Sequence, residues 1–227
     1  MTPERFANLQ RALERRQPDL TLFMDAVNKG QNLTSIIRTA DAVGIQRLHA
    51  STAGGGATRL QHMIPGGAKH WVAVTLHRST RAGLAALHAE GWRLVAAHGG
   101  AGTRDYRDVD YTAKVALIFG AEAVGLGDAA RAAADDHIAI PMHGIGTSLN
   151  VSVAVGVILA EAERQRLAAG LYAKSRLSPD ERERTLFEWS YPELAERFRQ
   201  QGRPYPALTA DGKLASNPLT DISTVSQ

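Results

Sequence analysis

Short apolar runs alternate with helical patterns along most of this 227-residue chain, and this alternation limits the folds that it can adopt. Strands are predicted over residues 20–27, 47–51, 71–76, 92–98, 114–119 and 137–140. Helices are predicted over residues 3–16, 32–43, 79–89, 126–134 and 149–168. Such alternation is typical of a mostly parallel sheet with helices on both faces. We therefore predict an α/β fold whose ligands bind at the carboxyl ends of the strands.

The two ends of the chain differ in character from this central part. Residues 3–16 place apolar side chains on one stripe and arginines elsewhere, as in an amphipathic helix. Beyond residue 172 the pattern indicates one or two short helices and then a loosely held tail. The predicted segments are a basic N-terminal helix, a central domain and a C-terminal helical extension with a tail, over residues 1–19, 20–172 and 173–227.

Composition narrows the setting and the kind of partner. The chain has no cysteine, which excludes disulfides and thiolate metal sites and agrees with a cytoplasmic protein. Its N-terminus lacks the apolar stretch of a signal peptide, and no window is long and apolar enough to predict a membrane span. Of its 26 lysines and arginines only five are lysines. Guanidinium groups pair well with phosphate, which favours nucleic acid, although GC-rich coding would give the same composition.

Several common catalytic and cofactor motifs are absent. The stretch "RLVAAHGGAG" (93–102) lacks the third glycine of a dinucleotide fingerprint and does not open a helix. The stretch "GAEAVGLGD" (120–128) lacks the Lys-Ser/Thr of a phosphate-binding P-loop. Ser148 is not flanked by the glycines of a hydrolase nucleophile, and the eight histidines form no HExxH. We therefore expect neither a nicotinamide site nor a metal.

The junction between a glycine-rich loop and the helix predicted at 149–168 is the most unusual feature of the chain. Ser148 and Asn150 lie there, and both are residue types that cap helix N-termini. Capping alone does not explain why three glycine-rich loops, 98–102, 120–127 and 141–148, all follow predicted strands. Glycine lets the backbone approach a flat ligand closely, so these loops indicate a shared ligand site.

Three stretches carry a resemblance to a known family. "NLTSIIRTADAVG" (32–44), "ALIFGAEAVGL" (116–126) and "IPMHGIGTSLNVSVAVGVILAEAERQR" (140–166) resemble, in order and spacing, the motifs of the SpoU branch of the SPOUT RNA 2′-O-methyltransferases. The resemblance is strongest to the TrmH-type tRNA (guanosine-2′-O)-methyltransferases, covers nearly the whole chain and is weakest near the C-terminus. It implies S-adenosylmethionine as cofactor and tRNA as partner, with the D-loop guanosine at position eighteen as the methylated nucleotide. It also implies a C-terminal deep trefoil knot and a homodimer with active sites near the subunit interface.

The resemblance also implies the site residues. The residues matching catalytic positions are Asn32, Arg38, Glu122, Ser148 and Asn150. The residues expected to hold the cofactor are Ala97, His98, Gly120, Ile140, Met142 and Leu149. Basic residues expected to contact RNA are Arg11, Arg15, Arg16, Lys29, Arg164 and Arg166. No metal is implied.

Two departures and two open choices accompany these expectations. Family members usually have His-Lys-Pro-His-Asn where this chain has "NKGQN" (28–32), and "MVQSLN" where it has "IGTSLN" (145–150). In the mechanism, either Arg38 accepts the proton of the ribose hydroxyl or it clamps a substrate phosphate that does. In function, the alternatives are a SpoU relative acting on ribosomal RNA and a non-catalytic RNA-binding protein on the same scaffold.

Overall fold

The computed structural model describes residues 1–26, 30–51, 71–121 and 125–215. Two compact units make up the chain: one comprises residues 16–174, and the other comprises residues 1–15 with the C-terminal part from residue 175. Within the described parts of the chain, no helix is long and apolar enough to cross a membrane.

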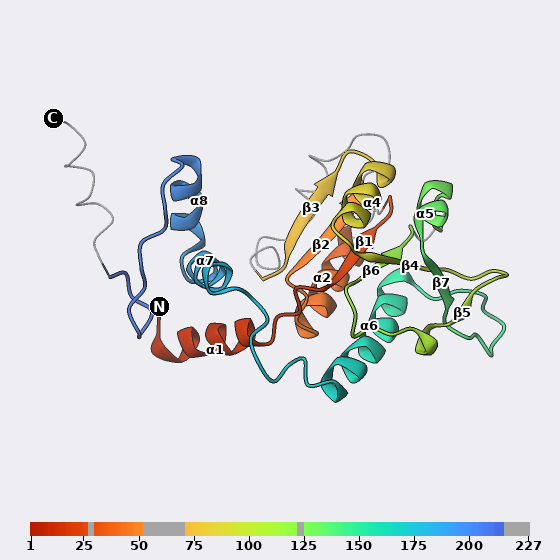
Figure 1. Ribbon diagram of the computed structural model, residues 1–227, viewed down its shortest axis with the longest axis horizontal. Coiled ribbons are helices and arrows are strands. Elements are labelled where there is room, and N and C mark those ends of the chain that lie inside the picture. Colours follow the sequence, from red (N-terminus) through yellow and green to blue (C-terminus); the bar gives the residue numbers. More distant parts are fainter. Residues whose placement is uncertain (27–29, 52–70, 122–124, 216–227) are drawn as a thin grey trace. The chain divides into compact units, whose positions relative to one another are not determined.

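The larger unit is built on a seven-stranded sheet in which every strand pairs with its neighbours in parallel (Figure 1). In spatial order the strands are β3 (Ala73–His77), β2 (Arg47–Ser51), β1 (Leu20–Met24), β6 (Val115–Phe119), β4 (Arg93–Ala97), β7 (Asp136–Ala139) and β5 (Arg104–Asp105). The predicted parallel sheet is thus confirmed. β5 is an addition, because its two polar residues lie in a stretch expected to be a loop.

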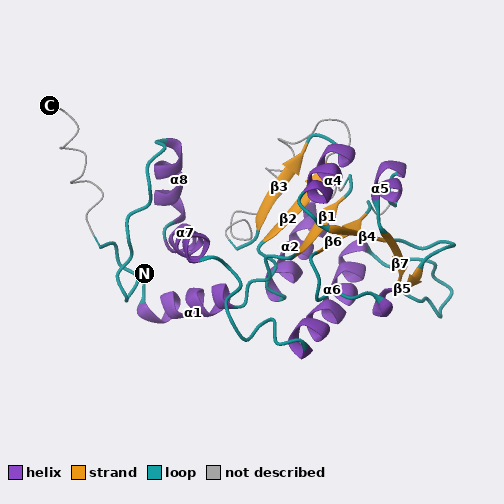
Figure 2. Ribbon diagram, viewed as in Figure 1, coloured by secondary structure: helices purple, strands orange, loops and turns teal. Residues whose placement is uncertain are grey.

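Helices cover both faces of this sheet, as predicted (Figure 2). One apolar cluster joins α2 (Gly30–Ala42) and α6 (Val151–Ala168) to strand residues such as Leu22 and Leu117. The other joins α4 (Thr80–Ala89) and α5 (Asp128–Ala133) to Phe23, Ala116 and Ile118. Because alternate residues of a strand point to opposite faces, the two clusters lie on opposite sides of the sheet.

The ends of α2 and α6 show which cap predictions hold. Gly44, with φ 81°, ends α2, where Ile45 N–H donates to the Ala40 carbonyl at 2.9 Å. The helix was predicted to begin at Asn32, but it begins at Gly30, so Asn32 lies in its first turn. A glycine can start the helix because the first N–H groups have no intrahelical partner to lose. Asn150 does cap α6, since its side chain accepts from Ser152 N–H at 2.8 Å.

The smaller unit joins the two ends of the chain. α1 (Pro3–Glu14) packs against α7 (Pro179–Ser190), and α8 (Pro192–Gln200) follows α7 directly. The apolar stripe expected on α1 is buried and consists of Phe6, Leu9 and Leu13. The terminal helices, expected as separate extensions, therefore share one core.

Candidate active site

A cavity of about 530 Å³ opens at the carboxyl ends of β4, β6 and β7. Its walls come from residues 97–100 at the end of β4, the segments 119–121 and 125–126 at the end of β6, residues 138–140 and 142 at the end of β7, and the loop and first turns of α6. Parallel sheets bind ligands at this edge, and the volume lies within the range of small-molecule sites.

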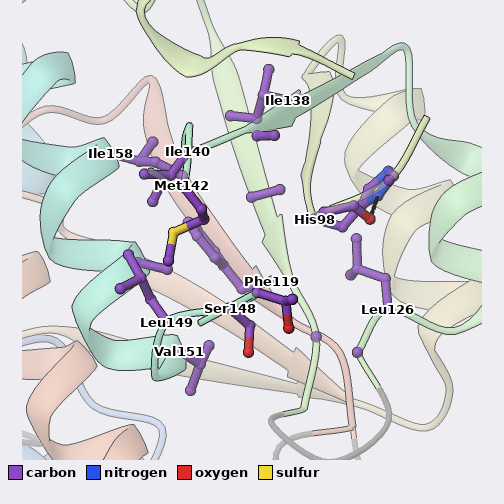
Figure 3. A pocket seen from close by; sticks show the side chains of 18 of the residues that line it. His98, Phe119, Leu126, Ile138, Ile140, Met142, Ser148, Leu149, Val151 and Ile158 are labelled. Carbon is purple, nitrogen blue, oxygen red and sulfur yellow. Dashed lines mark hydrogen bonds between the residues drawn. The ribbon is translucent and has the colours of Figure 1, made fainter. Parts of the chain in front are cut away.

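All six residues expected to hold the cofactor line this one cavity. They are Ala97, His98, Gly120, Ile140, Met142 and Leu149. Figure 3 shows Met142, Leu149 and Ile158 on one wall and His98 with Leu126 on the other. Residues from four separate segments thus converge on one space, while their role toward a cofactor remains a prediction.

Gly120 sits where the chain folds back over the end of β6. A Cβ atom at this position would lie 2.2 Å from the Gly125 carbonyl oxygen and 2.4 Å from the Leu126 nitrogen. Gly125 N–H in turn donates to the Ala121 carbonyl at 2.7 Å. Any side chain at Gly120 would push this backbone apart, so the glycine is needed for the shape of the cavity wall.

The first and third motifs meet at the N-terminal end of α6. Asn150 Nδ2 lies 3.5 Å from Asn32 Oδ1 on α2, although the two residues are 118 positions apart in the sequence. Ser148 lines the cavity two residues before this cap. Three of the five residues expected to be catalytic therefore lie beside the cavity or at its rim.

Of the other two, only Arg38 is among the residues that the structure describes. Arg38 is exposed on α2 and does not line the cavity. Glu122 lies outside the described residues, as does Lys29 among the residues expected to contact RNA.

Two of the basic residues expected to contact RNA are buried. Arg166 has a fully buried side chain that donates to Asp19 at 2.7 Å, to Gln17 at 2.9 Å and to the Ala113 carbonyl at 2.9 Å. Arg16, 2% exposed, donates to Asp41 at 2.5 Å and to the Ile45 carbonyl at 2.9 Å. The prediction that Arg16 and Arg166 contact RNA is therefore corrected. Their guanidinium groups form buried hydrogen bonds to distant segments of the chain and do not face solvent.

The other described basic residues of this set lie on the surface. Arg11 and Arg15 are exposed on and just after α1. Arg164 is also exposed, with its guanidinium 2.7 and 2.8 Å from the carboxylate of Glu161. Hydrogen bonding to Arg164 lowers the pKa of Glu161 below its ordinary value. On the surface, Arg164 therefore already has a carboxylate partner.

One charged residue of the cavity was not anticipated. Arg131 on α5 lines it, with Nη1 3.1 Å from His98 Nδ1 and Nε donating to the Leu126 carbonyl at 3.2 Å. His98 Nε2 lies 2.9 Å from His137 Nδ1. A single arginine in an alanine-rich helix carries no pattern that would reveal it. Among the described residues, no group of three or more histidines and carboxylates is arranged to hold a metal ion.

The sequence of this chain matches family models and curated proteins over most of its length. A family model described as the SpoU rRNA Methylase family matches residues 19–160, and one described as SpoU, rRNA methylase, C-terminal matches residues 164–217. The tRNA (guanosine(18)-2′-O)-methyltransferase of Escherichia coli (strain K12) is 41% identical over 219 residues, covering 96% of this chain and 95% of that protein.

Solved structures agree with these matches. The A. aeolicus TrmH/SpoU tRNA modifying enzyme superposes with a TM-score of 0.77 at 36% identity, over 84% of this chain and 97% of that one. The SpoU methyltransferase AviRb from Streptomyces viridochromogenes, in complex with the cofactor AdoMet, gives a TM-score of 0.56 at 29% identity, over 68% of this chain and 62% of that one.

Proposed function

Because this chain belongs to the SpoU methylase family, we propose that it transfers a methyl group from S-adenosylmethionine to the ribose 2′-hydroxyl of guanosine 18 in tRNA. The observation that carries the proposal is the placement of the Asn32–Asn150 contact beside a cavity lined by all six residues expected to hold the cofactor. The relatives whose names specify this reaction cover almost the whole chain.

The cavity suits S-adenosylmethionine in size and chemistry. Apolar side chains that include Ile138, Ile140 and Leu149 offer a slot for the adenine ring. Loop backbone at Gly99 and Gly120 leaves N–H and carbonyl groups near the ligand without intervening side chains. When bound, the cofactor supplies an electrophilic methyl group on a sulfonium.

The residues at the rim serve the nucleophile. A ribose hydroxyl is a very weak acid, so it must be positioned, and its developing negative charge must be stabilised. Asn32 and Asn150 would orient the ribose, and Arg38 would stand on the nucleophile side. Removing a proton from a guanidinium is costly, since its pKa lies above about 12. Arg38 therefore either accepts the hydroxyl proton transiently or clamps a substrate phosphate that accepts it.

A second copy of the chain would complete the site. Met142, Ile145, Leu149 and Val153 are exposed apolar residues around the start of α6, and Ile145 is fully exposed. Such a group favours an interface with another protein surface. Since Arg38 does not line the cavity of its own chain, we propose a homodimer in which two copies assemble each site. Within each copy, we propose that the C-terminal part of the larger unit is threaded into the trefoil knot of the family.

Purified protein, radiolabelled S-adenosylmethionine and unmodified tRNA transcript test the proposal. We expect methyl incorporation that maps to position 18 and disappears with a transcript carrying 2′-deoxyguanosine there, because that substrate lacks the nucleophile. Incorporation into ribosomal RNA fragments alone would favour the ribosomal alternative. Binding of tRNA without transfer to any RNA would favour the non-catalytic one.

A further inference from the structure

The cavity has one wall whose charge the proposed reaction does not explain. On α5, Arg131 contributes a guanidinium, and the cavity's other described lining residues include no lysine, arginine, aspartate or glutamate. In the described part of the chain, no carboxylate pairs with this guanidinium, whose partners are His98 and the Leu126 carbonyl. A lone positive charge in a largely apolar cavity indicates a negatively charged ligand group.

Hydrogen-bond chemistry shows how Arg131 is held. A guanidinium can only donate, so His98 Nδ1 accepts from Arg131 and carries no proton. His98 Nε2 then carries the proton and donates to His137 Nδ1 at 2.9 Å. The opposite tautomer would let His98 Nδ1 donate to the Gly99 carbonyl at 3.0 Å, but it would turn an N–H toward Arg131. The hydrogen bonds from His98 to His137 and from Arg131 to His98 therefore fix the orientation of the Arg131 guanidinium.

We propose that Arg131 binds the carboxylate of the amino-acid part of S-adenosylmethionine, with His98 as the residue that positions it. The inference rests on the proposed function, since it assigns an end of the same ligand. A carboxylate matches the planar fork of a guanidinium, and the ligand carries only one carboxylate and no phosphate. The apolar wall at Ile138, Ile140 and Leu149 is left for the adenine.

The position of Arg131 favours the cofactor over an RNA phosphate. Asn32, Arg38 and Asn150, which would serve the RNA, belong to α2 and the start of α6 on one face of the sheet. Arg131 belongs to α5, which packs on the opposite face. Figure 3 shows His98 across the cavity from Leu149 and Met142. A ligand that spans the cavity would thus have its two ends on different walls.

The experiment compares two ligands that differ only in the amino-acid part. S-adenosylhomocysteine carries it, and 5′-methylthioadenosine lacks it. Calorimetry on wild type and Arg131→Leu should show at least about a tenfold loss of affinity for S-adenosylhomocysteine, as expected for a hydrogen-bonded charge pair. Affinity for 5′-methylthioadenosine should stay within about twofold. Arg131→Lys should recover part of the loss, and Arg107→Leu, an exposed arginine outside the cavity, is the matched control.

The other outcomes distinguish a wrong assignment of Arg131 from a wrong role for His98 and from a failure of the proposed function. Equal loss of both ligands in Arg131→Leu, or loss of neither, overturns the carboxylate assignment. A variant that keeps its affinity for S-adenosylhomocysteine but binds tRNA more weakly would assign Arg131 to the RNA. His98→Asn keeps an acceptor near the Nδ1 position and should retain more of the ligand difference than His98→Ala, and equal loss in the two would remove the positioning role. If wild type binds neither nucleoside, the proposed function itself fails.

Discussion

The polar residues at the two ends of helix α6 serve different purposes. At its N-terminal end Ser148 and Asn150 are exposed and lie at a cavity. At its C-terminal end Arg166 is fully buried, and its partner Asp19 directly precedes β1. α6 runs antiparallel to the strands that it covers, so its start lies at their carboxyl ends and its finish at their amino ends. In a parallel sheet the carboxyl edge binds ligands, which leaves polar residues at the amino edge free to stabilise the fold.

The comparison predicts first that Arg38→Ala, on the helix facing the N-terminal end of α6, costs activity and not stability. We expect kcat to fall by about 10²–10⁴-fold, the usual contribution of proton transfer and charge stabilisation. The free energy of unfolding should change by no more than about 0.5 kcal/mol, because the side chain is exposed. Arg38→Lys should fail nearly as badly, since an ammonium lacks the planar fork. Steady-state kinetics and urea unfolding measure the two effects, and more than a tenth of the wild-type kcat would argue against a direct role.

At the other end, Arg166→Met should destabilise the protein by about 3 kcal/mol, because it removes the partner of a largely buried carboxylate. Urea unfolding measures this loss. Adding Asp19→Asn should restore part of it by removing the charge left behind. In buffer without urea, at a temperature where the variant is folded, the salt dependence of its tRNA binding should equal that of the wild type. A change in unfolding free energy below about 1 kcal/mol would contradict the structural role.

This contrast also explains what could be predicted from the sequence. The parallel sheet was predictable because apolar runs and helical periodicity are local patterns. The burial of Arg166 was not, since its partners Asp19 and Tyr111 lie 147 and 55 residues away. Arg131 was missed for the same reason, because it contacts His98, 33 residues away in the sequence, only after α5 packs beside β4.

The motif residues Asn32 and Asn150 could be predicted from the sequence. Asn32 and Asn150 come from segments whose order and spacing carried the family resemblance, and the fold brings them together. β5 escaped prediction because a strand of two polar residues, Arg104 and Asp105, has no periodicity to detect.

The Asn150 side chain both caps α6 and contacts Asn32 at the site, and Asn150→Asp should separate the stabilising role from the catalytic one. Aspartate keeps the oxygen that accepts from Ser152 N–H and suits a helix N-terminus, so stability should stay within about 0.5 kcal/mol. It lacks the amide donor that faces Asn32, so we expect kcat to fall at least about tenfold. Asn150→Ala should lose about 1 kcal/mol in addition, because the cap is gone. Thermal unfolding and methyl-transfer rates on both variants test this, and an active Asn150→Asp would leave Asn150 with a capping role alone.

The smallest effect is expected at Arg164, which is exposed on α6 two residues before the buried Arg166. Its pair with Glu161 is solvent-exposed on the arginine side, so Arg164→Ala should change the free energy of unfolding by less than about 0.5 kcal/mol. If the guanidinium also contacts an RNA phosphate, the slope of log Kd against log salt should fall by about one contact, equally for all tRNAs. Arg199→Ala, which removes an exposed arginine that also pairs with glutamates, is the matched control. An unchanged slope would mean that Arg164 serves only its ion pair, and together with buried Arg166 this would move the RNA-contacting surface away from the C-terminal end of α6.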